Sequence, residues 1–450
     1  MNLNNIENMF FIGIGGMGMS SLAEYFLNEE KQVGGYDRDI SENTDRLQKL
    51  GIKILFNDSF DEINPKFINK HNTLIVYTPA IPSSNRLLTE FSNSNFICIK
   101  RAELLGLVVK RGKCIAVAGT HGKTTTTSIL AHLLNSSNIS TTSFVGGILE
   151  DYNSNFLYNG NKLFLVEADE YDKSFLNLSP EYACITSIDP DHLDIYTDFQ
   201  GVENGFISFI NNLEKKGFLI VQEDLQFNHP KYGFNPNSDY YIKNIRVKNS
   251  SYLFDIITPD LNYNDITFPI PGKHNLLNAL AAFIISIKLG CEINLLKPAL
   301  ASFKGVKRRF TYHVRNENKI YIDDYAHHPE EINSVFQAIK EIYPAQDILV
   351  AFQPHLFSRT RDFADEFAES LSQFDAVLLL DIYPARETPI DGINSLWLLD
   401  KIDSPIKKLV CKSELSTEIL SQDMKINITM GAGDIGEECI KIKNSLKHAS

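Results

Sequence analysis

The chain has 450 residues, 43% of them hydrophobic and 22% charged, which is typical of a globular protein of about three domains. Its 43 basic and 56 acidic residues give a formal charge of −13, and no stretch is basic enough to follow a phosphate backbone, so we expect no nucleic-acid partner. No apolar run approaches the roughly 20 residues that span a bilayer. The first ten residues lack the basic region of a signal peptide, and the six cysteines form no C-x-x-C pair, so we expect a reducing cytoplasm, no membrane insertion and no disulfide framework.

The first region, residues 1–107, alternates apolar strands with helices. Strands are predicted at 9–14, in a segment that ends at Gly35-Tyr36-Asp37, at 52–56 and at 73–77, and a helix is predicted at 19–27. This alternation predicts a parallel sheet that is covered on both faces.

A glycine-rich turn follows the first strand, with glycines at 13, 15, 16 and 18. Such a turn lets the backbone approach a pyrophosphate, and the next helix offers free N–H groups. Asp37 ends the second strand, where a carboxylate can bond a ribose hydroxyl. The pattern favours a nucleotide site, and the alternatives are an NAD site or a turn that serves only helix–strand packing.

The second region, 108–305, begins with a strand at Lys113 that leads into Gly119-Thr120-His121-Gly122-Lys123-Thr124 and a helix. The usual phosphate-loop spacing requires glycine at 117, where Val117 stands. The parts still suit ATP, because Lys123 supplies a charge for the β- and γ-phosphates and the Thr124 hydroxyl can reach Mg²⁺. The alternative is a solvated turn with a capping threonine.

Acidic residues follow two further strands of this region. Glu167, Asp169 and Glu170 come after the strand at 163–166, and Asp189 and His192 come after the strand at 182–188. Ligands gather at the carboxyl ends of parallel strands, and hard oxygen ligands suit Mg²⁺. We expect Glu167 and His192 to hold metal, the alternative for each being a solvated cap.

The remainder of this region changes character. Residues 217–270 carry short aromatic and β-branched runs between turns, which predict an antiparallel insertion or an edge sheet. A helix is predicted at 274–289, with His274 and Asn278 one turn apart on one face near its start. This pair could cap the helix or hold a base or ribose.

The third region, 306–450, begins with a predicted hairpin of strands 310–315 and 319–323. Helices at 330–342 and 360–373 then alternate with strands at 347–352, 375–380 and 426–430. Its polar groups are Arg308-Arg309, Asp323-Asp324-Tyr325-Ala326-His327-His328 and Gln353-Pro354-His355 with Arg359. Adjacent histidines on one extended segment cannot point the same way, so we expect substrate recognition here and no zinc site.

In chain order, GIGGMGMS, GTHGKTTTT, EADE, DHLD, GKHNLLNALAA, KRRF, DDYAHHPEE, QPHLFSRTRDF and TMGAGDI resemble the motifs of the Mur ligases over essentially the whole chain. The resemblance implies an α/β fold of three domains. These are a Rossmann-like domain for a UDP-sugar (1–107), a P-loop-type ATPase with a parallel sheet and a small antiparallel part (108–305), and a Rossmann-like domain for the amino acid (306–450).

The resemblance also implies site residues. Lys123, His192, Arg309 and His355 would be catalytic, and Thr124, Glu167 and His192 would hold metal, with two Mg²⁺ ions expected. The other implied contacts are these: for ATP, Gly119, Thr120, His121, Gly122, Lys123, Thr124, Thr125, His274, Asn278, Arg309 and Asp324; for the UDP-sugar, Gly15, Gly16, Met17, Gly18 and Asp37; for the amino acid, Tyr325, His355 and Arg359.

The implied reaction is ATP-dependent addition of L-alanine to the lactyl carboxylate of UDP-N-acetylmuramate, by a monomer or weak homodimer. Residues 201–209 lack the lysine that later-acting sister ligases convert to a carbamate, which favours the alanine-adding subgroup. Leu356 stands where that subgroup often has arginine. An alternative within the family is a ligase that recycles a murein tripeptide onto the same UDP-sugar. A dehydrogenase that uses NAD would leave the Gly-Lys-Thr loop unexplained, and a nucleotide sensor would leave the metal and phosphate groups idle.

Overall fold

The computed structural model describes residues 3–189, 199–248, 251–385 and 387–448, which form two compact units. The first unit takes in the residues up to 245 together with 254–267 and 277–303, and the second takes in 246–253, 268–276 and 304–450. Three mostly parallel sheets with helices confirm the predicted α/β class. The predicted domain joints at 107/108 and 305/306 stay predictions.

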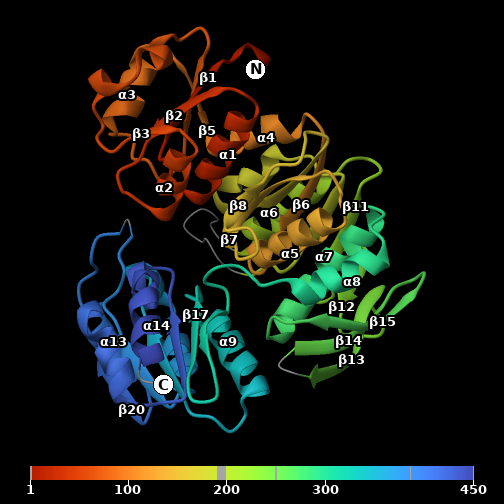
Figure 1. Cartoon of the computed structure of the whole chain (residues 1–450), viewed down its shortest axis with the longest axis vertical. Coiled ribbons are helices and arrows are strands. Elements are labelled where there is room, and N and C mark those ends of the chain that lie inside the picture. The colour runs from red at the N-terminus through yellow and green to blue at the C-terminus, as the bar shows by residue number, and fades with distance from the viewer. Residues whose placement is uncertain (1–2, 190–198, 249–250, 386, 449–450) are drawn as a thin grey trace. The chain divides into compact units, whose positions relative to one another are not determined.

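The first sheet has five parallel strands in the order β3-β2-β1-β4-β5 (Figure 1, red to orange). All five residues of the central strand β1 are buried, as expected for a strand covered on both faces. The strand order reverses beside β1, so the loop after β1 lies where ligands bind in such sheets. The elements are β1 (Asn8–Ile12), β2 (Gln32–Tyr36), β3 (Lys53–Leu55), β4 (Thr73–Tyr77), β5 (Ile97–Lys100), α1 (Met17–Asn28), α2 (Glu42–Lys49), α3 (Arg86–Asn93), α4 (Arg101–Val109) and the 3₁₀ turns η1 (Leu3–Asn5), η2 (Phe60–Glu62) and η3 (Pro65–Ile68).

The central sheet has ten strands in the order β15-β14-β13-β12-β11-β10-β6-β9-β7-β8. Its strands are β6 (Lys113–Ala118), β7 (Thr142–Leu149), β8 (Ser154–Leu157), β9 (Leu163–Ala168), β10 (Tyr182–Ile185), β11 (Phe218–Gln222), β12 (Lys231–Gly233), β13 (Tyr240–Lys248), β14 (Ser251–Ile257) and β15 (Asn262–Phe268). The helical elements are α5 (Lys123–Ser136), η4 (Tyr171–Asn177), α6 (Phe199–Asn211), α7 (Lys273–Lys288) and α8 (Ile293–Ser302). Strands β6 and β9 are parallel neighbours. The glycine loop between β6 and α5 and the EADE segment at the end of β9 therefore lie at the same edge of the sheet.

The segment 217–270 lies at one edge of the central sheet, which agrees with the predicted edge position. Its first strands extend the central sheet in parallel: β11 pairs with β10, β12 with β11 and β13 with β12. A carboxylate organises this course, since Glu223 accepts hydrogen bonds from the amides of Phe234 and Asn235 and from the Ser238 hydroxyl. These bonds turn the chain so that β13 starts in the same direction as β12. At the other end of the sheet, β7 and β8 pair antiparallel.

The third sheet has six strands in the order β16-β17-β21-β18-β19-β20 (Figure 1, cyan to blue). The predicted hairpin is confirmed, because β16 and β17 pair antiparallel, and the other pairs are parallel. The elements are β16 (Thr311–Arg315), β17 (Ile320–Asp324), β18 (Ile348–Phe352), β19 (Ala376–Leu379), β20 (Ile406–Leu409), β21 (Ile426–Met430), α9 (Pro329–Ile342), α10 (Phe357–Asp362), α11 (Ala364–Leu371), α12 (Ser395–Lys401), α13 (Lys412–Ser421), η5 (Asp434–Glu438) and α14 (Cys439–His448).

The helix predicted at 360–373 is two helices. Phe363 has φ −117° and ψ 27°, outside the helical range, and separates α10 from α11. The Phe363 ring packs edge-on against the His328 ring, with the ring centroids 4.8 Å apart. The helical pattern of the sequence does not predict this contact. Across the described ranges, no helix combines the length and the apolar character that crossing a bilayer requires.

Candidate active site

The first glycine loop joins β1 to α1. Gly16 caps α1, and the Gly15 amide donates to Asp37 Oδ2 at 2.7 Å. A Cβ at Gly15 would lie 2.9 Å from the same oxygen, so the carboxylate fits only against glycine. The Asn43 side chain donates to the Gly15 carbonyl at 2.9 Å. The structure thus brings Asp37 to the loop, where it holds the backbone; its contact with a ribose stays a prediction.

The second glycine loop joins β6 to α5 and is fixed by its neighbours. Gly119 (φ +134°) and Gly122 (φ +81°) lie in conformations that favour glycine. A Cβ at Gly119 would be 2.1 Å from Thr186 Oγ1, and one at Gly122 would be 2.6 Å from Asn278 Oδ1. The close packing explains why this loop needs its two glycines at these positions.

Lys123 starts α5 and points into an acidic environment. Its ammonium donates to the Glu170 carboxylate at 2.7 and 2.9 Å and to the Gly119 carbonyl at 2.6 Å. Burial alone would lower the pKa of Lys123, but the neighbouring carboxylates, Glu170 foremost, raise it. Lys123 therefore carries a positive charge directly behind the glycine loop.

Oxygen atoms that can ligate a metal ion lie on Thr124, next to Lys123, and on Glu167. The Thr124 hydroxyl donates to Glu167 Oε1 at 2.9 Å, and the Gly146 amide donates to Glu167 Oε2 at 2.9 Å. A hydroxyl and a carboxylate next to this glycine loop are the hard ligands that Mg²⁺ prefers, so the residues present fit this ion. His192, the other predicted metal ligand, lies outside the described residues.

The loop is also tied to the end of β10. The Thr120 amide donates to the Ser187 carbonyl at 3.0 Å, and the Asp189 amide donates to Thr120 Oγ1 at 3.0 Å. The His121 amide donates to Ser187 Oγ at 2.9 Å. The carboxyl ends of β6, β9 and β10 therefore meet at one edge, as the sequence predicts for a parallel sheet.

The two predicted residues on α7 have different surroundings. Asn278 Oδ1 accepts the Thr126 hydroxyl at 3.1 Å, which attaches α7 to α5 inside the first unit. His274 is exposed and belongs with the first turn of α7 to the second unit. The structure thus groups Asn278 with the glycine loop, and the contact of His274 with ATP stays a prediction.

In the second unit, Asp324 organises the KRRF segment. Its oxygens accept the amides of Phe310 and Ala326, both at 2.7 Å. Burial raises the pKa of Asp324 to about 6, although Arg309 and the two amides oppose the rise. The Arg309 guanidinium lies 5.2 Å from the centre of the Tyr325 ring. Three predicted residues, Arg309, Asp324 and Tyr325, are therefore neighbours.

His355 and Arg359 flank the start of α10. His355 Nδ1 lies 3.5 Å from Arg359 Nη1, and the His355 ring stacks on Tyr383 with the centroids 5.7 Å apart. The His327 ring is 6.0 Å from the His355 ring, centre to centre. The structure thus brings together His355 and Arg359, which the sequence analysis named in one group.

The partners of two polar residues, Glu170 and Arg308, were not predicted. Glu170 is the partner of Lys123 and only 2% exposed, although EADE itself was an evident acidic signal. Arg308 donates to Asp323 and to the carbonyls of Gly431 and Gly433, and so holds the loop after β21. The sequence does not indicate which of the two adjacent arginines, Arg308 or Arg309, turns inward.

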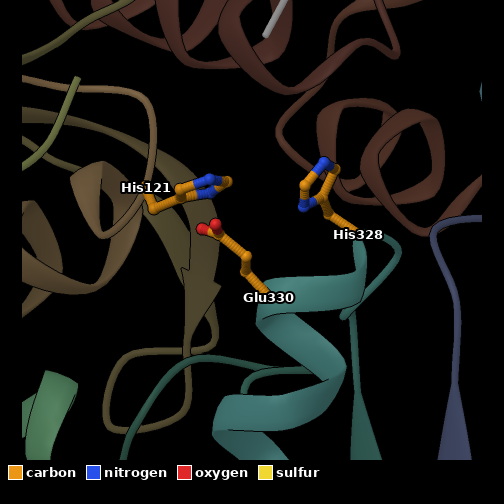
Figure 2. Close-up of side chains that lie close together, drawn as sticks. All are labelled: His121, His328 and Glu330. Carbon is orange, nitrogen blue, oxygen red and sulfur yellow. The ribbon is translucent and has the colours of Figure 1, made fainter. Parts of the chain in front are cut away.

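Side chains of the types that can ligate metal occur in both units. Figure 2 shows His121, from the loop after β6 in the first unit, and His328 and Glu330, from the start of α9 in the second. The ligand atoms of His313, Asp323 and Cys439 lie within 4.8 Å of one another. Both Asp323 oxygens are already engaged, by Thr429 and by Arg308, and burial raises the pKa of the Cys439 thiol to about 12. The cluster of His313, Asp323 and Cys439 is therefore part of a packed hydrogen-bond network within the second unit.

Comparison with known families decides the relationship. The family description "Mur ligase family, catalytic domain" matches residues 8–113, "Mur ligase middle domain" matches 117–286, and "Mur ligase, glutamate ligase domain" matches 308–425. The chain belongs to the Mur ligase family. The order of motifs along the chain had predicted this membership.

Individual relatives agree over the full length. The chain is 50% identical over 448 residues to the UDP-N-acetylmuramate–L-alanine ligase of Christiangramia forsetii and 51% identical over 446 residues to that of Flavobacterium psychrophilum, with 99% of each chain covered. The crystal structure of UDP-N-acetylmuramate–alanine ligase from Thermotoga maritima matches with a TM-score of 0.84 at 27% identity, covering 98% of this chain and all of that one. A murein peptide ligase from Psychrobacter arcticus shares the fold, with a TM-score of 0.70 at 21% identity over 98% of each chain.

Proposed function

We propose that this chain joins L-alanine to the lactyl carboxylate of UDP-N-acetylmuramate at the expense of ATP, in peptidoglycan precursor synthesis. The observation that carries the proposal is the sequence identity of 50% and 51%, over 99% of the chain, to two relatives named UDP-N-acetylmuramate–L-alanine ligase. The chain is accordingly an ATP-dependent carboxylate–amine ligase. The tripeptide-recycling alternative has weaker support, since the murein peptide ligase structure is 21% identical and shows the fold alone.

The chemistry requires activation of the carboxylate. A carboxylate is a poor electrophile, because it is anionic and has no leaving group. Transfer of the γ-phosphoryl group of ATP to one carboxylate oxygen gives an acyl phosphate and releases ADP. The neutral amine of L-alanine then attacks the carbonyl carbon, and the tetrahedral intermediate expels phosphate to leave an amide. Phosphoryl transfer depends on positioning and positive charge more than on covalent help from the protein.

Lys123 is the centre of the proposed phosphate site. Its charged ammonium behind the glycine loop is suited to the β- and γ-phosphates of ATP. Mg²⁺ would be held by Thr124, Glu167 and His192, and it supplies further charge neutralisation for the phosphates. The other proposed ATP contacts are Gly119, Thr120, His121, Gly122, Thr125, His274, Asn278, Arg309 and Asp324.

The other two substrates are assigned to the outer regions. The UDP-sugar would bind at Gly15, Gly16, Met17, Gly18 and Asp37 in residues 1–107. The carboxylate of L-alanine needs a planar bidentate donor, which Arg359 provides, and His355 or Tyr325 would accept the proton from its amine. We place the enzyme in the cytoplasm, with residues 108–305 for ATP, residues 306–450 for the amino acid, and two Mg²⁺ ions.

The test is phosphate release from ATP with UDP-N-acetylmuramate and one amino donor at a time. L-alanine should be the best donor, and the murein tripeptide should be inert. Glycine and L-serine should be slow, because one methyl group in a pocket discriminates by only about 10- to 200-fold. Highest activity with the tripeptide would replace the proposal by the recycling alternative. Absence of phosphate release with every donor would end the ligase assignment.

A further inference from the structure

Tyr252 in β14 makes two hydrogen bonds inside the second unit. The side chain is 2% exposed. Its phenol donates to Glu341 Oε2 on α9 at 2.6 Å and accepts the Gly272 amide at 3.0 Å. A carboxylate acceptor makes the first bond one of the stronger kind. One buried hydroxyl therefore joins α9 to the turn that precedes α7.

Gly272 in turn sets the place of His274. Gly272 has φ +97°, and a Cβ there would lie 2.6 Å from Cε1 of the His274 ring, so the ring rests directly on the glycine. The Gly272 carbonyl accepts the amides of Asn275 at 3.0 Å and Leu276 at 3.3 Å, the first hydrogen bonds of α7. A shift of Gly272 would move both the His274 ring and the helix start.

Helix α9 supports the same turn from one face. Ala338 and Glu341 are three residues apart and so share a face of α9. A Cβ at Gly272 would lie 3.3 Å from the Ala338 Cβ, while Glu341 holds the Tyr252 hydroxyl. The His274 turn is thereby fixed to the helix that follows Asp324 and Tyr325 along the chain.

We propose that Tyr252 is a positioning residue for ATP, which acts by holding Gly272 and hence His274 against α9. The inference rests on the proposed function, in which His274 contacts ATP. Tyr252 itself is buried, and its two hydrogen bonds described above join it to Glu341 and Gly272, neither of which is a predicted substrate contact. Its effect on ATP therefore passes through the Gly272 amide.

The test is Tyr252→Phe, which keeps the ring and removes the hydroxyl. The KM for ATP should rise about fivefold or more, while the KM values for UDP-N-acetylmuramate and L-alanine stay within about twofold. Hydrogen exchange measured by mass spectrometry should become faster in a peptide that covers residues 270–276. The matched control is Tyr232→Phe in the first unit, whose buried hydroxyl accepts from Cys184 Sγ at 3.6 Å and which should leave both readouts unchanged.

A conservative variant at the partner sharpens the result. Glu341→Gln keeps an oxygen that can accept a hydrogen bond from the Tyr252 phenol. The KM for ATP should therefore rise less in Glu341→Gln than in Glu341→Leu. An unchanged KM for ATP in Tyr252→Phe, or an equal rise for all three substrates, would overturn the positioning role. Absence of ligation activity in the wild-type chain would instead overturn the proposed function. The ATP affinities of the wild type and Tyr252→Phe, measured by titration calorimetry, would then test the positioning role of Tyr252.

Discussion

Lys123 is the residue on which the proposed phosphate site depends most. Lys123→Ala should abolish ATP-dependent ligation, because removal of one electrostatic contact to a transferring phosphate costs about 10²-fold or more in rate. Binding of the UDP-sugar should survive, since the first glycine loop is a separate element on another sheet. Phosphate release and titration calorimetry with the UDP-sugar measure the two halves.

The control for that variant is Lys113→Ala on β6. Lys113 is an exposed partner of Glu181 and should be dispensable, because surface ion pairs contribute little. Loss of UDP-sugar binding in Lys123→Ala would show that the two sites are not independent.

Glu167 tests the metal site at the same scale. Glu167→Gln keeps the shape of the side chain and removes its charge, so the Mg²⁺ concentration needed for half-maximal rate should rise steeply, with partial rescue at high Mg²⁺. Glu181→Gln, which changes a carboxylate away from the loop, should leave the Mg²⁺ dependence as it is. If both variants match the wild type, Glu167 serves only to order Thr124 and the Gly146 amide.

Asp324 makes a prediction about pH. Its pKa is raised from 3.8 to about 6, so between these values the folded chain binds more protons at this carboxyl than the unfolded chain does. Its contribution to stability therefore falls as the pH rises through this window, by at most about 3 kcal/mol. Asp324→Asn cannot titrate there.

The measurement is the thermal midpoint of wild type minus that of Asp324→Asn. This difference should shrink from pH 4 to pH 7. A difference that grows or stays constant would mean that Asp324 is ionised in the folded chain throughout the window.

At the scale of elements, β18 and α10 build the proposed amino-acid site. His355→Ala should raise the KM for L-alanine much more than the KM for ATP, because His355 stacks on Tyr383 beside Arg359 and lies away from the glycine loop in sequence and sheet. Leu356→Arg should be tolerated and is the control at the adjacent position. A rise confined to the KM for ATP would assign this element to the nucleotide.

The elements themselves were largely predictable, and their side-chain partners were not. The strand before each glycine loop, the helix after it and the β16–β17 hairpin follow from local patterns of apolar, glycine and turn residues. The parallel course of β11 to β13 depends on the Glu223 carboxylate, and the break between α10 and α11 accompanies the contact of Phe363 with His328. The bond between Tyr252 and Glu341 spans 89 residues. No local pattern encodes contacts at that separation.

The same holds within the site. Spacing predicted site roles for Lys123, Thr124 and Glu167 but did not indicate that Glu170 would be the ion-pair partner of Lys123. Both carboxylates belong to EADE, and on a strand that continues into a turn the sequence does not tell which one points to the lysine. The choice is made by the packing of β9 against β6, a tertiary effect.

At the scale of the whole molecule, the first unit has a core that joins two sheets. Tyr25 and Phe26 of α1 belong to the same hydrophobic cluster as Phe144 and Phe164 of the central sheet. The Tyr25 ring lies 5.7 Å from the Phe144 ring, centre to centre. The second unit has clusters of its own around β17, β18 and β21. We therefore expect calorimetry to resolve two transitions, one for each unit.

Asn155 in β8 allows this division to be tested. It is fully buried, accepts Arg46 Nη2 of α2 at 2.8 Å and donates to the Met17 carbonyl of α1 at 2.7 Å. Asn155→Ala leaves these polar groups without that partner, so the first unit's transition should fall by about 2 to 8 °C while the second stays in place. The matched variant is Asn427→Ala in β21, an equally buried asparagine that bonds the Met424 carbonyl and should lower only the second transition. If either variant lowers both transitions together, the two units unfold as one, and the separate cores do not act as separate cooperative units.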